Sequence, residues 1–201
     1  MKITDIKPQI KNKERMNIYL DNQYYCSLDL YTIMKYRVKE GQEISREELI
    51  KIQKEAEFEK GFNYSLSYIS RSVKTEKQMK RKLVEKGYIE EIIVEIIEKL
   101  KELSLIDDRD YCKRYIETYK KKKGERLLRQ ELKLKGVSET IVDDELKELD
   151  RDEDIVVQIA RKYMKNKEVS LQNKRKCINH IVSKGFSYDE ALKAYNLIEG
   201  E

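Results

Sequence analysis

The sequence of 201 residues is poor in residues that break helices and in residues that build catalytic or metal sites. It contains one proline, Pro8, together with seven glycines, one histidine, three cysteines and no tryptophan. Because proline is the strongest helix breaker, the chain after Pro8 is free to form helices. The cysteines, Cys26, Cys112 and Cys177, are odd in number and far apart, which predicts reduced thiols in a cytosolic protein and not a disulfide framework.

The sequence also lacks an apolar run of about 18 residues and a charged-then-apolar leader, so we expect no transmembrane span and no signal peptide. Charged residues make up 40% of the chain and the mean hydropathy is −0.80, which is typical of a soluble protein with much surface and little core. Isoleucine, leucine and tyrosine at helical spacing argue against a disordered chain. We therefore expect a folded cytoplasmic protein without a membrane partner.

Catalytic and metal-binding patterns are absent. His180 is the only histidine, and Cys177 three residues before it supplies only half of a tetrahedral metal site. The pairs Asp107-Asp108 and Asp143-Asp144 are adjacent in sequence, so on a helix their side chains diverge by about 100°; we interpret the first pair as a helix N-cap. No glycine-rich phosphate loop or nucleophile elbow is present. We predict no enzyme activity, no metal and no cofactor.

One motif returns twice at a fixed distance. Lys86-Gly87-Tyr88 is followed after 49 residues by Lys135-Gly136-Val137, and after another 49 by Lys184-Gly185-Phe186. In every copy the residue four before the glycine is aliphatic, and the residues ten and thirteen after it are apolar. A period of this length with a preserved apolar frame indicates a structural repeat. Each glycine fits a left-handed helix C-cap, and the lysine before it suits the negative end of the helix dipole.

The predicted fold class is mainly α: an elongated array of three tandem three-helix repeats with a small N-terminal β-hairpin region. The hairpin turn is placed at Asp21-Asn22, because both residues tolerate positive φ. Helix starts are predicted at Ser45, Thr75 and Ser187, each followed three residues later by the Glu or Gln of a capping box. The predicted domains are residues 1–60 (hairpin plus a helix), 61–110, 111–153 and 154–201.

Charge is segregated in phase with the repeat, although the net charge is only +5. Residues 64–88 contain 7 Lys or Arg and 2 Asp or Glu, residues 111–137 contain 10 and 3, and residues 155–186 contain 8 and 1. The ratio reverses to 3 to 8, 2 to 9 and 1 to 4 in residues 89–110, 138–154 and 187–201. If the repeats stack alike, a basic and an acidic stripe result, which suits a polyanion or a partner of alternating charge. The alternative is that the charges simply solvate the outer faces.

The candidate contact residues come from this charge pattern. The run Lys120, Lys121, Lys122 and Lys123 is the densest; alone it fits a solvated helix end, and together with Arg126 and Arg129 it becomes a better candidate for an anionic contact. The other predicted contact residues are Arg71, Lys74, Lys77, Lys80, Arg81, Lys174 and Arg175. The fourteen tyrosines are assigned to core or interface packing, with base stacking as the minor alternative.

Several of these motifs together resemble the regulatory protein RecX family. They are Tyr68-Ile69-x-Arg71-Ser72, Thr75-Glu76-Lys77-Gln78-Met79, Leu83, Lys86-Gly87-Tyr88, Leu105-Ile106-Asp107-Asp108 with Tyr111, Lys123-Gly124, Leu132 and Lys135-Gly136-Val137. The similarity covers nearly the whole chain, and the hairpin and third repeat resemble longer members from Gram-positive-type bacteria. Ser104 and Cys112 stand where the family often has glycine and alanine; both are small, so the departures touch packing more than function.

The resemblance implies a non-enzymatic modulator, expected to be an inhibitor, of the RecA recombinase. Members of the family bind RecA, lie along the groove of its filament on single-stranded DNA, and restrain strand exchange, ATP hydrolysis and co-protease activity; some also bind DNA. The implied partners are the RecA filament and single-stranded or duplex DNA, and a monomer would suit groove binding. The competing interpretations are a stand-alone helical nucleic-acid-binding module or transcriptional regulator, and a scaffold that binds another protein and no nucleic acid.

Overall fold

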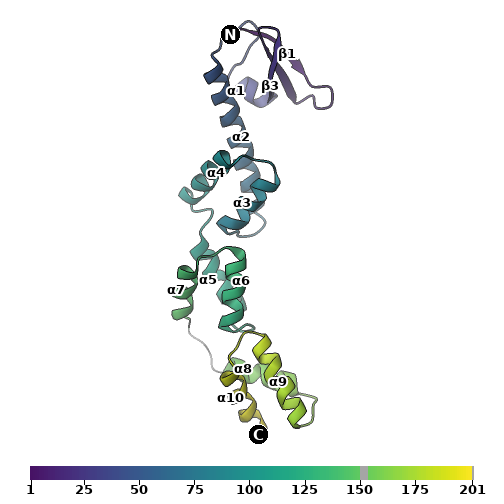
Figure 1. Cartoon of the computed structure of the whole chain (residues 1–201), viewed down its shortest axis with the longest axis vertical. Coiled ribbons are helices and arrows are strands. Elements are labelled where there is room, and N and C mark those ends of the chain that lie inside the picture. Colours follow the sequence, from purple (N-terminus) through teal and green to yellow (C-terminus); the bar gives the residue numbers. More distant parts are fainter. Residues whose placement is uncertain (150–153, 201) are drawn as a thin grey trace. The chain divides into compact units, whose positions relative to one another are not determined.

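The computed structural model describes residues 1–149 and 154–200, and Figure 1 shows the order of their helices and strands. The strands are β1 (Ile3–Pro8), β2 (Arg15–Leu20) and β3 (Gln23–Asp29). The helices are α1 (Leu30–Lys35), α2 (Arg46–Ile69), α3 (Glu76–Glu85), α4 (Glu90–Glu102), α5 (Asp108–Tyr119), α6 (Glu125–Lys135), α7 (Glu139–Lys147), α8 (Asp154–Met164), α9 (Leu171–Ser183) and α10 (Tyr188–Glu199). The predicted fold class is confirmed: the chain is mainly α, with helices in consecutive groups of three after a small sheet.

The chain forms two compact units. Unit 1 comprises residues 1–71 and 82–100, and unit 2 comprises residues 72–81 and the described residues from 101 onward. Unit 1 therefore holds the sheet, α1, α2 and most of α4. Unit 2 holds the start of α3 and the second and third groups of helices, α5–α7 and α8–α10.

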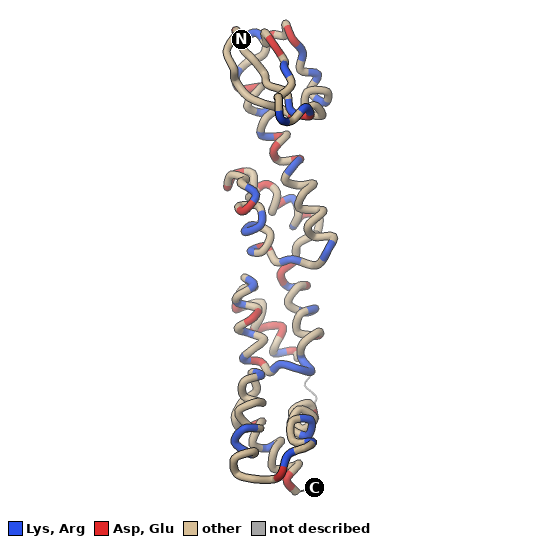
Figure 2. The backbone as a smooth tube through the Cα atoms, turned by 90° about the vertical axis from the view of Figure 1, so that its right-hand side faces the viewer, with Lys and Arg blue, Asp and Glu red and all other residues tan. Residues whose placement is uncertain are grey.

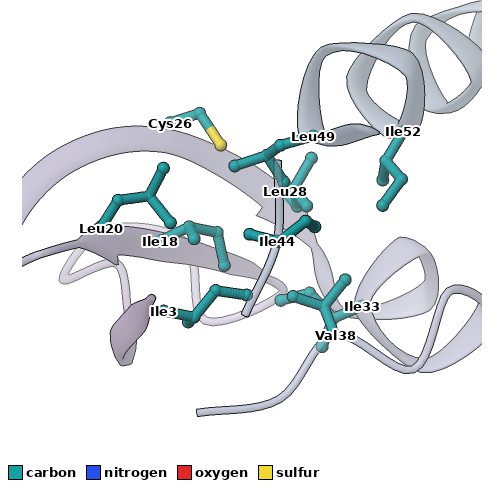
Figure 3. Packing of buried hydrophobic residues seen from close by; sticks show 10 residues of the cluster. All are labelled: Ile3, Ile18, Leu20, Cys26, Leu28, Ile33, Val38, Ile44, Leu49 and Ile52. Carbon is teal, nitrogen blue, oxygen red and sulfur yellow. The ribbon is translucent and has the colours of Figure 1, made fainter. Parts of the chain in front are cut away.

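The sheet of unit 1 is antiparallel with the order β1-β2-β3. Its predicted hairpin turn is confirmed, since Asp21 and Asn22 have φ of 47° and 67°. Strand β1 adds to this hairpin a third strand, which an isolated pair of strands needs to be stable. Figure 3 shows the core that forms where the sheet meets α1 and α2; its buried residues are Ile3, Ile18, Leu20, Cys26, Leu28, Ile33, Val38, Ile44, Leu49 and Ile52.

Helix α2 starts where the sequence predicts, because the Ser45 side chain accepts a hydrogen bond from the backbone N–H of Glu48. It continues without a break to Ile69, so the domain boundary expected at residue 60 lies within a helix. Gly61 in its middle is buried, and a Cβ there would lie 2.5 Å from Ile96 Cδ1. The close approach holds α2 against α4. The division into four domains stays a prediction.

The glycines of the 49-residue motif end their helices as predicted. Gly87, Gly136 and Gly185 have φ of 84°, 95° and 94°, which is the left-handed region that favours glycine. The other local expectations also hold: Thr75 and Gln78, like Ser187 and Glu190, exchange reciprocal capping hydrogen bonds. All three cysteines are buried and free. No helix in the described ranges is long and apolar enough to span a membrane.

Within unit 2 the motif has a second role, because it joins successive groups of helices. The hydroxyl of Thr75, at the start of α3, donates to the carbonyl of Lys135 at the end of α6 over 2.6 Å. The N–H of Gly124, at the start of α6, donates to the carbonyl of Lys184 at the end of α9 over 2.9 Å. The beginning of the second helix in one group therefore bonds to the end of the second helix in the next.

Candidate polyanion-binding site

The predicted contact residues near α3 are mostly engaged with neighbours. Lys80 forms an ion pair with Glu76 at 2.7 Å, the Lys77 side chain packs over Gly136, and Lys74 contacts the Ser72 hydroxyl. Arg71 and Arg81 are exposed. These side chains hold the start of α3 in place more than they present a surface of free charge.

The four lysines of the run 120–123 differ in their surroundings: two form ion pairs within unit 2 and two are exposed. The run is a continuous blue stretch of the tube in Figure 2. Lys120 pairs with Glu117 at 2.8 Å, whereas the Lys123 ammonium pairs with Glu131 at 2.6 Å and lies 4.0 Å from the Tyr119 ring centre. Lys121 and Lys122 between them are exposed.

Arg126 and Arg129, on α6, also make structural contacts. Arg126 Nη2 donates to the Val182 carbonyl of α9 over 2.7 Å, which reinforces the joint between α6 and α9. Arg129 pairs with Glu125 at 2.8 Å and with Asp143 of α7. The charge of Arg129 is therefore paired with carboxylates within unit 2, whereas Arg126 is held by a backbone carbonyl and pairs with no carboxylate among the described residues.

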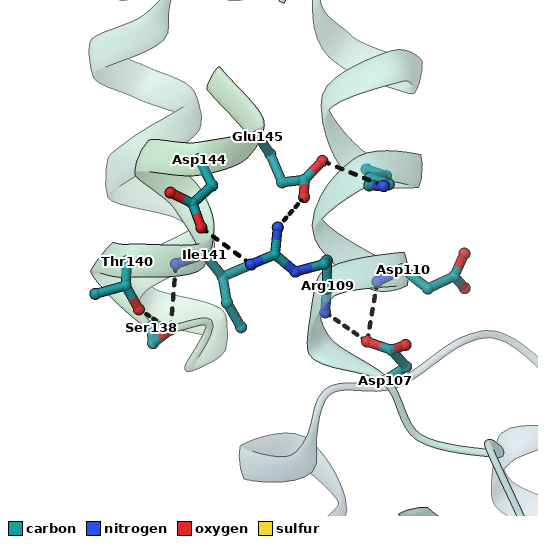
Figure 4. A network of polar contacts seen from close by, with 9 residues as sticks. Asp107, Arg109, Asp110, Ser138, Thr140, Ile141, Asp144 and Glu145 are labelled. Atoms are coloured by element: carbon teal, nitrogen blue, oxygen red, sulfur yellow. Dashed lines mark hydrogen bonds and ion pairs between the residues drawn. The ribbon is translucent and has the colours of Figure 1, made fainter. Parts of the chain in front are cut away.

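The acidic helix α7 neutralises basic residues of α5 as well (Figure 4). Arg109 donates to Asp144 over 3.0 Å and to Glu145 over 2.7 Å. These two hydrogen bonds raise the pKa of Arg109 above its ordinary value. Glu145 is buried, so the pair fixes α7 against α5 at a point where an unpartnered carboxylate would be costly. Part of the predicted acidic surface thus meets the basic helices of its own group.

In the third group, the two residues predicted on α9 differ. Lys174 pairs with Glu199 at 3.1 Å and lies over the Tyr195 ring, so it ties α9 to α10. Arg175 is exposed and has no ion pair with any residue in the described ranges. Of the thirteen predicted contact residues, Arg71, Lys77, Lys121, Lys122 and Arg175 are exposed and form no side-chain hydrogen bond or ion pair with a described residue.

The structure gathers Lys121 and Lys122 with residues that the charge pattern did not select. They line a hollow of about 660 Å³ in unit 2. Its other lining residues are Ile155, Gln158, Ile159, Lys162, Tyr163, Lys167, His180 and Lys184. We call the five lysines and His180 the basic hollow. No Asp or Glu lines it among the residues that the structure describes.

The lysines of the basic hollow come from three places: the segment after α5, α8 with the residues following it, and the end of α9. None of the five forms an ion pair with a described residue. Lys167 is engaged instead with an aromatic ring, its Nζ lying 3.1 Å from the Tyr163 ring centre. Like charges held close together in one concave place produce a positive potential that attracts anions.

His180 responds to this potential. Its ring stacks on Tyr163 with the centres 4.7 Å apart. Burial, followed by the charges of Lys184 and Lys167, lowers the pKa of His180 below its ordinary value of 6.5. In the absence of an anion the imidazole is therefore neutral at pH 7.

Sequence reasoning missed Lys162, Lys167, Lys184 and His180 as members of one site. The available signal was Lys184 of the repeated motif: its counterparts Lys86 and Lys135 lie 5.1 and 5.3 Å from the ring centres of Tyr64 and Tyr115. The motif lysine thus lies beside a tyrosine of the first helix in its group. In the described ranges no group of three or more His, Cys, Asp or Glu side chains could hold a metal ion.

The fold defines a class: mainly helical proteins built from consecutive groups of three helices that follow a small N-terminal sheet. Within that class, the chain belongs to the regulatory protein RecX family. The family's models match residues 1–45 (Regulatory protein RecX N-terminal domain), 62–100 (RecX, first three-helix domain) and 107–146 (RecX, second three-helix domain). The resemblance found in the sequence is confirmed.

Curated relatives and solved structures agree. Regulatory protein RecX of Bacillus licheniformis is 34% identical over 93% of this chain and 73% of its own length. That of Clostridium tetani is 34% identical over 97% of this chain and 93% of its own. A crystal structure of regulatory protein RecX matches with a TM-score of 0.69 and 29% identity, covering 100% of this chain and 99% of the other. RecX from Lactobacillus salivarius matches with a TM-score of 0.64 and 28% identity over 72% and 97%.

Proposed function

We propose that this protein is a non-enzymatic modulator of the RecA recombinase that binds the RecA–single-stranded DNA filament and inhibits it. Strand exchange, ATP hydrolysis and co-protease activity are the reactions it restrains. The observation that carries the proposal is the RecX similarity, which extends over 93% and 97% of the chain in two relatives. The proposal places the protein in the cytoplasm, as a monomer that works in recombination control and DNA repair.

The charge distribution supports a filament rather than a small ligand as the target. Acidic residues of α7 and basic residues of α5 and α6 are partly paired with one another, as in Arg109 with Asp144 and Arg129 with Asp143. The charges left over include the exposed Arg71, Lys121, Lys122 and Arg175, which are spread along the sequence. A filament repeats its binding surface and can meet such dispersed charges, whereas a small ligand needs them in one place.

The competing function is a stand-alone nucleic-acid-binding module, and RecA-dependent activity separates the two. The test is ATP hydrolysis by the cognate RecA on single-stranded DNA, with this protein titrated from well below one per RecA monomer. Inhibition at substoichiometric ratios is expected, because one bound protein in the groove affects several subunits. No effect at any ratio, together with tight DNA binding by the protein alone, contradicts the proposal and favours the nucleic-acid module.

The structure also determines which substitutions suit this assay. Changing Lys123, Arg126 or Arg129 removes contacts that hold unit 2 together, so a loss of inhibition would report misfolding. Arg71→Glu and Arg175→Glu change exposed residues without such contacts. We expect them to weaken inhibition, while the free energy of unfolding stays within about 0.5 kcal/mol of that of the unmodified protein, as for most surface substitutions.

A further inference from the structure

We infer that the basic hollow binds consecutive phosphates of a nucleic-acid strand, so that the protein contacts DNA directly through its third group of helices. The inference rests on the proposed function for the source of the phosphates, the DNA of the filament. It keeps Lys121 and Lys122 of the sequence prediction and combines them with Lys162, Lys167 and Lys184 instead of the residues of α3 and α6.

The charge arrangement favours an anionic ligand. Five ammonium groups line one hollow of about 660 Å³ without a lining carboxylate among the described residues. Several basic side chains of unit 2 outside the hollow are paired with carboxylates, such as Lys120 with Glu117 and Lys133 with Glu139. A concave place lined by one sign of charge concentrates counter-ions, and a polyanion that displaces them gains free energy from their release.

The number and origin of the lysines favour a strand over a single ion. One phosphodiester carries one negative charge, so several are needed to neutralise five lysines. The lysines come from the segment after α5, from α8 with the residues that follow it, and from the end of α9. A chain of phosphates passing through can meet all three groups in turn.

The aromatic residue of the hollow does not read bases. The Tyr163 ring is already stacked on His180 at 4.7 Å and covered by the Lys167 ammonium at 3.1 Å. Base recognition on single strands relies on open aromatic faces, and this face is occupied. The hollow therefore binds the backbone without sequence preference, which is what a protein acting along a recombination filament requires.

The test measures binding of a fluorescent oligothymidylate to the protein alone, without RecA, over a series of salt concentrations. The hollow variant carries Lys121→Gln, Lys122→Gln and Lys162→Gln. The control carries Lys147→Gln, Lys176→Gln and Lys193→Gln, which removes the same charge from exposed residues of α7, α9 and α10 outside the hollow. Circular dichroism melts establish that both variants fold.

In the hollow variant we expect at least a tenfold loss of affinity, and a salt slope smaller by about 2, since each phosphate contact on a single strand contributes about 0.7. The control should lose far less affinity and keep its slope. Equal losses in the two variants overturn the inference, because binding would then follow overall charge. If the unmodified protein does not bind DNA, the inference fails while substoichiometric ATPase inhibition still upholds the proposed function.

A duplex of the same length forms the second arm and distinguishes the source of the phosphates. Tighter binding to the single strand, dependent on the hollow lysines, supports the filament's single strand as the ligand. Hollow-dependent binding that is confined to the duplex overturns that assignment.

Discussion

The hydroxyl of Thr75 donates a 2.6 Å hydrogen bond to the backbone carbonyl of Lys135, sixty residues later in the chain. The N–H of Gly124 stands in the same relation to the carbonyl of Lys184 at 2.9 Å. Both donors are N-cap residues, and both acceptors are the lysine of the 49-residue motif. Carbonyls at a helix end lack intrahelical partners, so each motif supplies an acceptor that the preceding group of helices satisfies. The 49-residue period thus separates the two carbonyls, of Lys135 and Lys184, at which successive groups of helices are joined.

Thr75→Val should weaken this joint. Valine keeps the shape of threonine but removes the hydroxyl that caps α3 and bonds Lys135, and the site is fully buried. We expect the free energy of unfolding to fall by about 2 kcal/mol, from a lost cap and an unpaired carbonyl. Urea denaturation followed by circular dichroism measures it. Thr75→Ser retains the hydroxyl and serves as the control; no loss in Thr75→Val, or a loss smaller than in Thr75→Ser, would contradict the role of the hydrogen bonds.

Gly124→Ala should destabilise the second joint for a steric reason. A Cβ at residue 124 would lie 2.3 Å from the carbonyl carbon of Gly185 and from the N–H nitrogen of Phe186, both backbone atoms. We expect a loss of about 3 kcal/mol, because the two backbones must separate. Gly87→Ala is the comparison: its φ of 84° is unfavourable for alanine, unlike the extended φ of Gly124, but a Cβ there meets nothing within 4 Å, so its cost is only about 1 kcal/mol. A larger loss of unfolding free energy in Gly87→Ala than in Gly124→Ala would contradict the close backbone contact of Gly124 with Gly185 and Phe186.

Arg109→Gln should lower the melting temperature through Glu145. The Glu145 side chain is 7% exposed, and without Arg109 its remaining basic neighbour is Lys113 at 3.9 Å. A buried carboxylate without a close partner destabilises the folded state. Arg114→Gln on the same helix is the control, since its pair with Asp110 is exposed on both sides and such pairs contribute little. Adding Glu145→Gln to Arg109→Gln should recover part of the loss; no recovery would mean that the carboxylate is not its cause.

Local features of the fold were predictable because they depend on residues close in sequence. The turn at Asp21-Asn22, the C-cap at Gly136 and the capping box of Ser187 with Glu190 each follow from the conformations that one or two side chains allow. The spacing of the motif gave the three groups of helices. It did not reveal the joints, because the partners Gly124 and Lys184 are brought together only when helix groups pack.

The candidate site was less predictable because charge counts do not show which charges remain free. The second repeat holds ten basic residues against three acidic ones in residues 111–137, yet Arg129 pairs across to Asp143 and Arg126 is bound to a carbonyl. The basic hollow combines lysines from both sides of residues 123–161, and only the tertiary packing of α8 and α9 beside the α5–α6 connection reveals it. His180 stood out in the sequence only as half of a metal-ligand spacing, and nothing near it in the sequence placed it among these lysines.

DNA affinity should increase as the pH falls through the range in which His180 titrates. In the free protein burial and the charges of Lys184 and Lys167 lower the pKa of His180. Bound phosphates would offset those charges and raise the pKa, so the complex takes up a proton that the free protein lacks. Affinity then rises on going from pH 7.5 to 5.5, by about threefold for each half unit by which the pKa rises. The other titratable side chains that line the hollow with His180 are Lys121, Lys122, Lys162 and Tyr163.

The measurement is the same oligothymidylate titration at fixed salt, and His180→Gln is its control. Glutamine keeps a polar side chain without a titration in this range, so the pH dependence should flatten while binding at pH 7.5 changes little. Protonation of His180 also costs folding stability in the free protein: its lowered pKa means that stability is present above pH 6.5 and declines below it. Melts at each pH therefore accompany the titration. An affinity that stays constant from pH 7.5 to 5.5, in a protein that remains folded, would show that no phosphate binds near His180.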